Sequence, residues 1–367
     1  MWEWMPRRSN SPKGKAKRPV EAVARAALAL RRGEPVAVMG TDGIVVTARA
    51  VETAPHHALV KRKGRPRLLL THARARTLKM RLYTPGIVAL ALDPSMPAEA
   101  LRAIADPTAD MATPMKGPFA TLREKLPDAD AAAVKLAKLA GLLPAVVAVN
   151  GWTAGAAEVN ATDIGDYESE SARTLALVTR ARVPLADAPQ SEIVVFRAAD
   201  AGPEHCAIVI GQPPRAKPVL TRMHSSCFTG DLLASLRCDC GEQLRGAIAA
   251  ISKAGGGVLL YLAQEGRGIG LANKLRAYSL QDQGFDTLEA NTRLGFEEDE
   301  RLYGVAARML ELLGFGSVRL MTNNPLKVAG LKSAGIRVAA RVPHKFPSNT
   351  HNAAYLATKK AKAGHLL

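Results

Sequence analysis

The stretch Gly-Val-Leu-Leu-Tyr-Leu-Ala-Gln-Glu-Gly-Arg-Gly-Ile-Gly-Leu-Ala-Asn-Lys-Leu-Arg-Ala-Tyr-Ser-Leu-Gln-Asp-Gln, residues 257–283, indicates the fold of the second half of the chain. Residues 257–262 are a nearly continuous apolar run, which is typical of a strand buried on both faces. Residues 271–283 have the pattern of a helix, and a glycine-rich turn separates the two segments. A buried strand that leads through a tight turn into a helix predicts an α/β domain.

The same alternation extends outward from this stretch. In the second half we expect strands at 193–197, 206–210, 318–321 and 336–341, and helices at 243–254, 299–313 and 325–334. In the first half we expect strands at 35–39, 43–48, 67–71, 87–92 and 145–149, helices at 22–30, 130–142 and 169–179, and loops at 150–166. The predicted fold class is α/β, with two α/β domains, the C-terminal one a mixed sheet flanked by helices.

The domain boundary is expected within residues 184–192, where the regular pattern is interrupted. This gives a disordered basic tail at 1–19, a first domain at 20–187 and a second domain at 188–367. A length of 367 residues fits two domains of ordinary size, or three smaller ones.

The composition permits hydrophobic cores but no membrane helix. Hydrophobic residues make up 47% of the 367 residues, and aromatic residues make up only 4%. No run reaches the roughly 18 apolar residues that a membrane helix needs, and residues 1–19 lack the apolar stretch of a signal peptide. Four cysteines, three of them in one motif, do not form a disulfide framework. We therefore expect reduced thiols and a cytoplasmic location.

The net charge of +17 permits a nucleic-acid partner or an anionic small molecule. The positive charge is concentrated in the tail at 7–18 and in a second cluster at 61–81. Both segments fit solvated surface regions. No aromatic residues interleave with the charges, as a platform for single-stranded nucleic acid would need. We therefore do not expect a nucleic-acid partner.

Three of the four cysteines, Cys227, Cys238 and Cys240, form a Cys-x10-Cys-x-Cys pattern. Catalytic zinc sites usually have three protein ligands and leave a position for water, whereas structural sites have four. An open site would generate hydroxide near neutral pH. His224 is a possible fourth ligand that would close the site, so the structural alternative remains open. Cys206, in an expected strand, is interpreted as an inert core residue.

Two strand-to-helix turns carry side chains that could bind a nucleotide. Residues 264–270 include Glu265 and Arg267, and their glycines would let backbone amides approach an anion at the start of the helix. The turn is not the Gly-x-Gly-x-x-Gly of dinucleotide folds. Because ligands gather at the carboxyl ends of strands, Thr322 and Lys327 in the next such turn could meet the same ligand. Each motif alone is also compatible with an ordinary turn or helix cap.

Arg301 ends the acidic run Glu297-Glu-Asp-Glu-Arg301, which we expect in the first turn of the helix at 299–313. Acids there suit the helix dipole. An arginine at that end is mildly unfavourable, and it lies off the buried stripe, which favours a functional role such as binding phosphate. Tyr278 lies late in the preceding helix, where a tyrosine is more often a packing residue than a catalytic one.

Taken together, these segments resemble GTP cyclohydrolase II, the enzyme that opens riboflavin synthesis. The resemblance runs from about residue 190 to the end of the chain. It rests on Arg222-Met-His-Ser-Ser-Cys, Leu236-Arg-Cys-Asp-Cys-Gly, Gln264-Glu-Gly-Arg, Tyr278-Ser-Leu-Gln-Asp-Gln-Gly, Asp286-Thr-Leu-Glu-Ala-Asn, Leu294-Gly-Phe-Glu-Glu-Asp-Glu-Arg and Thr322-Asn-Asn-Pro. It implies a homodimeric zinc enzyme that converts GTP to 2,5-diamino-6-(5-phosphoribosylamino)pyrimidin-4-one, formate and pyrophosphate.

The resemblance also implies roles for matching residues. Cys227, Cys238 and Cys240 would bind zinc, whose hydroxide would attack the carbon between the two imidazole nitrogens of guanine and release formate. Magnesium would accompany the triphosphate. The residues that match GTP contacts are Arg222, Met223, His224, Ser225, Ser226, Gln243, Glu265, Gly266, Arg267, Thr287, Thr322 and Lys327.

Three further residues match the family's catalytic groups. Arg301 matches an arginine proposed to attack the α-phosphate, Asp299 matches the proposed proton acceptor, and Tyr278 matches a tyrosine beside the zinc and the purine. Because a guanidinium stays protonated in proteins, an electrostatic role for Arg301 is favoured over a covalent one. Family members commonly carry an acid where this chain has Ser226, so the tuning of the site is expected to differ.

Residues 20–185 resemble 3,4-dihydroxy-2-butanone 4-phosphate synthase, which is often fused ahead of this cyclohydrolase. The similarity rests on residues 22–38, 68–81 and 131–141. The synthase binds magnesium through an acid-rich run after its first strand, but here that place reads Met39-Gly-Thr-Asp-Gly-Ile-Val. Its Gly-His-Thr-Glu appears as Asp128-Ala-Asp-Ala131. Magnesium needs hard oxygen ligands in near-octahedral geometry, so we expect synthase activity to be absent.

The sequence is also compatible with three alternative functions. The first is a cyclohydrolase-like enzyme with another purine nucleotide product, against which Tyr278 argues. The second is a basic nucleic-acid-binding protein with a structural zinc. The third is a bifunctional riboflavin enzyme, which would consume ribulose 5-phosphate.

Overall fold

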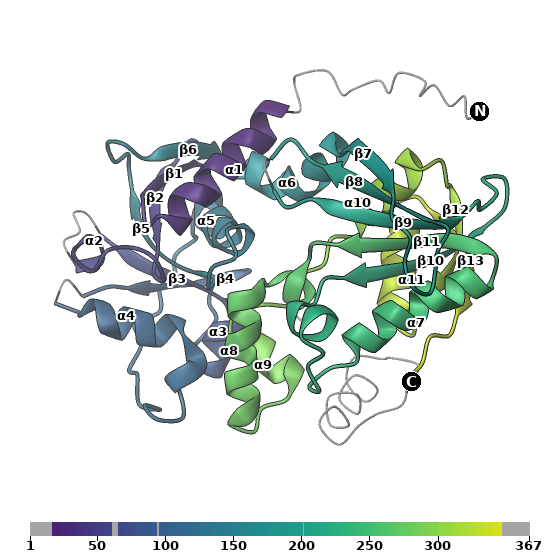
Figure 1. Cartoon of the computed structure of the whole chain (residues 1–367). Coiled ribbons are helices and arrows are strands. Elements are labelled where there is room, and N and C mark those ends of the chain that lie inside the picture. Colours follow the sequence, from purple (N-terminus) through teal and green to yellow (C-terminus); the bar gives the residue numbers. More distant parts are fainter. Residues whose placement is uncertain (1–16, 61–64, 94, 201, 298, 347–367) are drawn as a thin grey trace.

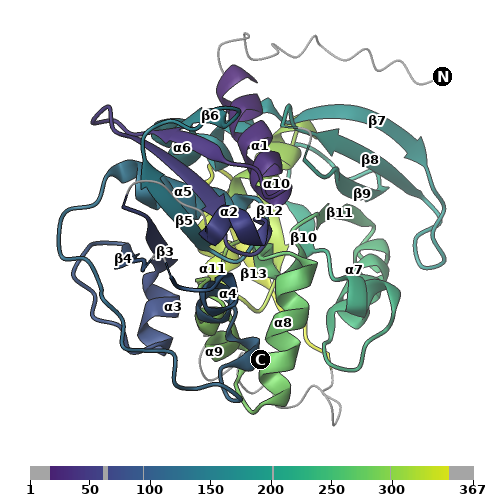
Figure 2. The same cartoon turned by 90° about the vertical axis from the view of Figure 1, so that its left-hand side faces the viewer.

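The computed structural model describes residues 17–60, 65–93, 95–200, 202–297 and 299–346. They form two sheets, each with helices packed on both faces (Figure 1, Figure 2). The predicted α/β class is therefore confirmed. Of the expected tail at 1–19, residues 1–16 lie outside the described residues, and helix α1 begins at Lys17. None of the described helices has the length and apolar character needed to span a bilayer.

The first sheet has the strand order β4-β3-β5-β2-β1-β6, and all its neighbours are antiparallel except β1 and β6. Helices α1, α5 and α6 cover one face, whereas α2, α3 and α4 lie on the other. The bounds are α1 Lys17–Arg31, β1 Val36–Met39, β2 Val45–Ala50, α2 His56–Val60, β3 Arg67–Thr71, α3 His72–Thr77, β4 Ile87–Ala91, α4 Ala98–Ala105, η1 Pro107–Ala109, α5 Asp128–Leu139, β5 Ala145–Asn150, β6 Ala157–Asn160 and α6 Ala161–Thr174.

The second sheet has the order β13-β12-β10-β11-β9-β8-β7. Its four strands from β13 to β11 are parallel and the rest are antiparallel, so the mixed sheet is confirmed. Helix α7 packs on one face, and α10 and α11 pack on the other. The bounds are β7 Ala176–Arg182, β8 Ser191–Arg197, β9 His205–Gly211, β10 Val219–Ser225, η2 Phe228–Leu232, α7 Cys240–Lys253, β11 Gly256–Leu262, η3 Glu265–Gly268, α10 Tyr303–Leu312, β12 Ser317–Met321, α11 Pro325–Ser333 and β13 Arg337–Val342.

Helices α8 (Leu271–Asp282) and α9 (Thr287–Arg293) follow strand β11 in the chain, but they do not pack on the second sheet. Helix α9 contacts α3 of the first half, and α8 contacts η1. Both helices lie next to α3 in the two views (Figure 1, Figure 2). Leu143 of the first half joins the small core beneath them, whose other buried members are Ile269, Ala277, Leu280, Ala290, Leu294 and Phe296. The segment that carries Tyr278 and Thr287 is thus held by both halves of the chain.

Three of the expected elements are wrong. The helix expected at 169–179 ends at Thr174, and residues 176–182 form the edge strand β7 of the second sheet. The loop expected at 150–166 contains strand β6 and the start of α6. The helix expected from 299 begins only at Tyr303, so Asp299 and Arg301 lie in an irregular segment before it.

Candidate active site

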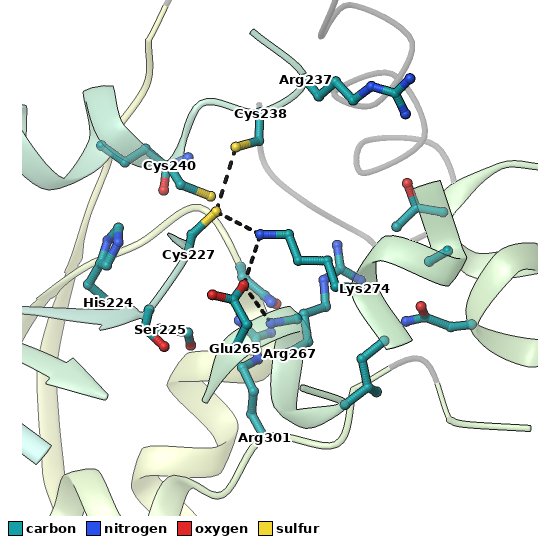
Figure 3. A pocket seen from close by; sticks show the side chains of 18 of the residues that line it. His224, Ser225, Cys227, Arg237, Cys238, Cys240, Glu265, Arg267, Lys274 and Arg301 are labelled. Atoms are coloured by element: carbon teal, nitrogen blue, oxygen red, sulfur yellow. Dashed lines mark hydrogen bonds and ion pairs between the residues drawn. The ribbon is translucent and has the colours of Figure 1, made fainter. Parts of the chain in front are cut away.

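Three cysteine side chains converge beyond the carboxyl edge of the second sheet. Strand β10 ends two residues before Cys227, and Cys238 and Cys240 come from the segment that enters α7 (Figure 3). Their sulfur atoms lie within 4.8 Å of one another. Gly230 leaves room for this cluster, because a Cβ there would lie 2.7 Å from the Cys238 sulfur and 3.1 Å from the Cys227 sulfur. A three-thiolate donor set of this size fits a metal ion.

The three thiols do not ionise alike. Hydrogen bonds from Cys238 and Cys240 lower the pKa of Cys227, with Lys274 adding to the effect. Hydrogen bonding to Cys227 raises the pKa of Cys238 and, further, that of Cys240. Cys227 is therefore the first to become a thiolate. Metal binding releases the remaining protons, because only thiolates act as ligands.

His224, the possible fourth ligand, interacts with Asp231 and not with the cysteines. Its Nε2 lies 3.0 Å from both carboxylate oxygens of Asp231, and its ring stacks on Tyr261 at 5.6 Å. The same carboxylate accepts hydrogen bonds from the Tyr261 hydroxyl and from the backbone amide of Cys227, each at 3.0 Å. His224 does not belong to the group of potential ligands within 4.8 Å. This arrangement supports the loop of Cys227 and favours the three-ligand interpretation.

Lys274 lies beside the sulfur cluster. Its Nζ donates to the Cys227 sulfur at 3.1 Å, to the Thr229 hydroxyl at 2.9 Å and to Glu265 at 2.8 Å. Burial opposes the charge, but the hydrogen bonds to Glu265 and Cys227 raise the pKa of Lys274. Glu265 also accepts from the backbone amide of Phe228 at 2.6 Å. Lys274 is therefore a charged group at neutral pH.

A second part of the site is strongly cationic. Arg222 from β10 and Lys327 from the first turn of α11 are only 5% and 8% exposed, and Arg301 faces the same cavity. Burial lowers the pKa of Arg222 to about 10, and burial followed by repulsion from Arg301 and Arg222 lowers the pKa of Lys327. The Lys327 ammonium donates to the Met223 carbonyl at 2.8 Å. Anionic oxygens would relieve this repulsion.

Asp299 and Arg301 form a bidentate pair. Arg301 donates from Nε at 2.7 Å and from Nη2 at 2.5 Å, and the Tyr303 hydroxyl donates to the same carboxylate at 3.0 Å. Burial opposes ionisation of Asp299, but these bonds lower its pKa overall. The carboxylate thus fixes the plane of the guanidinium.

The turn after β11 has a restrained backbone. Arg267 adopts φ 63°, which is uncommon for a residue with a side chain, and its carbonyl oxygen accepts from the Glu300 amide at 3.2 Å. At Gly268 a Cβ would lie 2.6 Å from the Glu300 carbonyl oxygen. Strain of this kind is retained where a side chain must be held in place. The turn therefore places Glu265 and Arg267 beside the segment that carries Arg301.

A single pocket, open to solvent, joins these parts. The predicted residues line it, with two exceptions. Asp299 is not part of the wall, but it is hydrogen-bonded to Arg301, which is. The Met223 side chain packs in the core, and only its carbonyl oxygen contributes, through Lys327. The remaining predicted residues at the cavity wall include Ser225, Ser226, Gln243, Gly266, Tyr278, Thr287 and Thr322.

Residues 176–343 match the family described as GTP cyclohydrolase II. The protein named GTP cyclohydrolase-2 of Azospirillum brasilense is 51% identical over 362 residues, which are 95% of this chain and 94% of that protein. The chain belongs to the GTP cyclohydrolase II family. The GTP cyclohydrolase-2 of Azotobacter vinelandii is 60% identical over 166 residues, which are 45% of this chain and 80% of that protein. A crystal structure described as RibBX, a two-domain 3,4-dihydroxy-2-butanone 4-phosphate synthase from A. baumannii, covers 87% of this chain and 99% of that chain at 19% identity, with a TM-score of 0.33.

Several residues of this site were not predicted from the sequence. Lys274 is the most important, and it could have been found because it lies four residues before Tyr278, on the same helix face. Asp231, which holds His224, has no such signal, because it lies in a short irregular turn. The other unpredicted residues of the cavity wall are Arg237, Ile269, Ala277, Gln281, Asn291, Asn323 and Asn324.

Proposed function

We propose that this protein is a GTP cyclohydrolase II, a hydrolase that converts GTP to 2,5-diamino-6-(5-phosphoribosylamino)pyrimidin-4-one, formate and pyrophosphate in riboflavin biosynthesis. The observation that carries the proposal is a single cavity with a three-cysteine cluster at one part and the buried cations Arg222 and Lys327 at another. A metal site can serve the hydrolysis of the base, and the cations can hold the phosphates.

The metal is proposed to be zinc, held by Cys227, Cys238 and Cys240. Soft thiolates favour zinc over the hard cations magnesium and calcium. The engagement of His224 with Asp231 supports three protein ligands and a place for solvent. When bound, zinc would supply an activated water at neutral pH for attack on the purine carbon between the imidazole nitrogens.

The chain's own residues bind and orient the nucleotide. Arg222 and Lys327 are buried and already positioned by the carbonyls of Met321 and Met223, at 3.0 Å and 2.8 Å, so little side-chain freedom is lost when phosphate binds. Magnesium is proposed to accompany the triphosphate, because it binds phosphate oxygens while keeping several waters. The Ser225 hydroxyl, buried and with no partner among the described residues, is available to the ligand.

Arg301 is proposed to act on the α-phosphate through its charge. Its guanidinium is held in a bidentate pair by Asp299, which supports the protonated form rather than a nucleophilic one. An oriented guanidinium stabilises negative charge that develops as pyrophosphate leaves. Asp299 is proposed to keep the Arg301 guanidinium in this orientation and to serve as the proton acceptor.

Tyr278 is proposed to act at the purine. Its hydroxyl lies 3.4 Å from that of Thr229, beside the sulfur cluster. Burial raises the pKa of Tyr278, so the phenol stays protonated at neutral pH and can donate a hydrogen bond to the opening ring.

The first half of the chain is proposed to lack synthase activity. Asp128 accepts a hydrogen bond from the Thr41 amide at 3.0 Å, and Asp42 accepts from the Ile44 amide at 2.9 Å. These bonds engage Asp42 in the turn after β1 and connect Asp128, the first residue of α5, to the same turn. We also propose a homodimer, from the family resemblance, and a cytoplasmic location, because the three thiols must remain reduced.

The direct test is incubation of the purified protein with GTP, with and without a chelator. We expect formate, pyrophosphate and the absorbance of the diaminopyrimidine, all of which depend on the metal. Formate without the diaminopyrimidine would indicate another purine product. Consumption of ribulose 5-phosphate would revive the bifunctional alternative, and retention on DNA at moderate salt without GTP turnover would favour the nucleic-acid-binding one.

Two variants separate the parts of the site. Cys238→Ser is expected to lose the metal and ring opening, and full formate release by this variant would exclude the cysteine site. Arg301→Ala is expected to abolish pyrophosphate release, and normal release would remove Arg301 from the mechanism.

A further inference from the structure

Lys274 is not one of the proposed metal ligands, but it is hydrogen-bonded to one of them, Cys227. It lies in the first turn of α8 and is 9% exposed, and the metal-site cysteines lie on other elements. Figure 3 shows its amine reaching between the Cys227 sulfur and the Glu265 carboxylate. A buried lysine in this position needs negatively charged partners.

The three acceptors use the full donor capacity of the amine. An ammonium group has three protons, and three acceptors lie within 3.1 Å: the Cys227 sulfur, the Thr229 hydroxyl and the Glu265 carboxylate. All three belong to the protein. Lys274 therefore does not need the nucleotide as a partner, and its role differs from that of the phosphate-binding cations.

The contacts tie three segments together. Cys227 and Thr229 belong to the loop after β10, which we call the metal loop. Glu265 begins the turn after β11, and Lys274 itself belongs to α8. Glu265 closes the connection from the other side, because its second oxygen accepts from the Phe228 amide at 2.6 Å. Tyr278, one turn further along α8, approaches Thr229 at 3.4 Å. Loss of the amine would release the metal loop and α8 from each other.

The charges favour the same role. Three thiolates around a divalent ion leave one net negative charge, which is costly in a partly buried site. The ammonium of Lys274 offsets this charge. Its hydrogen bond also draws electron density from the Cys227 sulfur, so this ligand donates less charge to the metal and the metal remains a stronger Lewis acid.

We propose that Lys274 is a positioning residue of the metal centre, which orients and partly neutralises the Cys227 thiolate and, with Glu265, fixes the metal loop against α8. This inference rests on the metal site proposed above. Groups that support metal ligands in this way typically contribute about 10- to 100-fold to metal affinity or activity.

The test compares Lys274→Met with Lys253→Met, which replaces an exposed lysine at the end of α7. Both proteins are loaded with Co²⁺, and the sulfur-to-cobalt charge-transfer band is recorded without GTP. Because the hydrogen bond stabilises the sulfur electrons, its loss is expected to move the band to longer wavelength. Zinc affinity, measured by competition with a chelator, is expected to fall about 10- to 100-fold. Lys253→Met should have the same band position and the same zinc affinity as the wild type.

Turnover provides the third measurement. In Lys274→Met we expect kcat for formate release to fall, with the KM for GTP changed less than about twofold, because the amine binds no nucleotide in this arrangement. Lys274→Gln, which is also uncharged but polar, is the second variant if the methionine protein does not fold, and its band should shift in the same direction.

A folded variant with unchanged band and zinc affinity would overturn the proposal, even if turnover fell, since Lys274 would then act on substrate. The band is recorded without nucleotide, so this outcome is separate from failure of the proposed GTP reaction, which wild-type formate release reports.

Discussion

Gly230 determines how closely the three sulfur atoms can approach one another. A Cβ at this position would lie 2.7 Å from the Cys238 sulfur and 2.9 Å from the Cys240 Cβ, closer than real contacts allow. We predict that Gly230→Ala forces the sulfurs apart and lowers zinc affinity at least about tenfold, comparable with loss of a supporting group. Metal content after dialysis against a chelator measures this.

Gly316→Ala is the matched control for this substitution. An added Cβ there meets nothing within 4 Å, so metal content and formate release should equal those of the wild type. Equal zinc retention in both alanine variants would show that the Gly230 loop adjusts without cost.

The residues of the site were predictable where the chemistry depends on residue type and spacing. The Cys-x10-Cys-x-Cys pattern identified the cluster of Cys227, Cys238 and Cys240 directly. The role of His224 could not be resolved in this way, because Asp231 binds it only after the chain has turned back through η2. Lys274 likewise depends on the packing of α8 against two loops, which no local pattern encodes.

Among the elements, the segment after η1 is joined to α3 by a buried charge cluster. Asp110 accepts from Arg74 Nη1 at 2.5 Å and also binds Lys116. Burial opposes ionisation of Asp110, but the hydrogen bonds from Arg74 and Lys116 lower its pKa below the ordinary 3.8. Its contribution to stability is therefore present above about pH 4 and is lost as the pH falls through the lowered pKa.

We predict that Asp110→Asn lowers the free energy of unfolding by about 3 kcal/mol near neutral pH, since it leaves Arg74 buried without a charged partner. The difference from wild type should begin to shrink below about pH 4 and should disappear as the pH falls through the lowered pKa of Asp110, where the wild-type carboxylate is also protonated. Urea unfolding at several pH values measures it, with the exposed Asp187→Asn as control. A difference that stays constant with pH would contradict the ionic explanation.

The elements themselves followed the sequence pattern where burial was uniform, as for the buried strand β11 and the cores of α5 and α7. The errors arose where another interaction outweighed the local pattern. Residues 176–179 have helix-forming Ala and Leu, yet pairing with β8 makes them an edge strand. At Asp299 the carboxylate accepts hydrogen bonds from the amide and the guanidinium of Arg301. These bonds stabilise a non-helical conformation, so α10 begins only at Tyr303.

At the scale of the whole molecule, the first half of the chain supports the segment that carries the catalytic candidates. Glu52 binds Arg276 of α8 at 2.8 Å, and the Thr71 hydroxyl donates to the Gly295 carbonyl at 2.9 Å. Lys138 of α5 binds Glu300, next to Arg301, at 2.6 Å. These contacts give the first half of the chain a structural task at the candidate active site.

The substitution Lys138→Ala tests whether the first half supports the active site. Lys138 binds Glu300, and the backbone amide of Glu300 donates to the carbonyl of Arg267. Loss of the ion pair should loosen the segment on which both Arg267 and Arg301 depend. The pair is partly exposed, at 20% and 23%, so we expect a cost of about 0.5–1 kcal/mol, or a two- to fivefold fall in kcat/KM for GTP. Steady-state formate release measures it.

Lys135→Ala provides the control from the same helix, since Lys135 pairs with Glu168 at 3.4 Å within the first half of the chain. That variant should keep the wild-type kcat/KM. The exchanged pair Lys138→Glu with Glu300→Lys should recover part of the activity that each single reversal loses, because the attraction is restored across the same interface. If the single reversals leave kcat/KM unchanged, the first half does not hold the catalytic segment through α5. Its support would then come from the Glu52–Arg276 pair, the Thr71–Gly295 hydrogen bond and the core around Leu143.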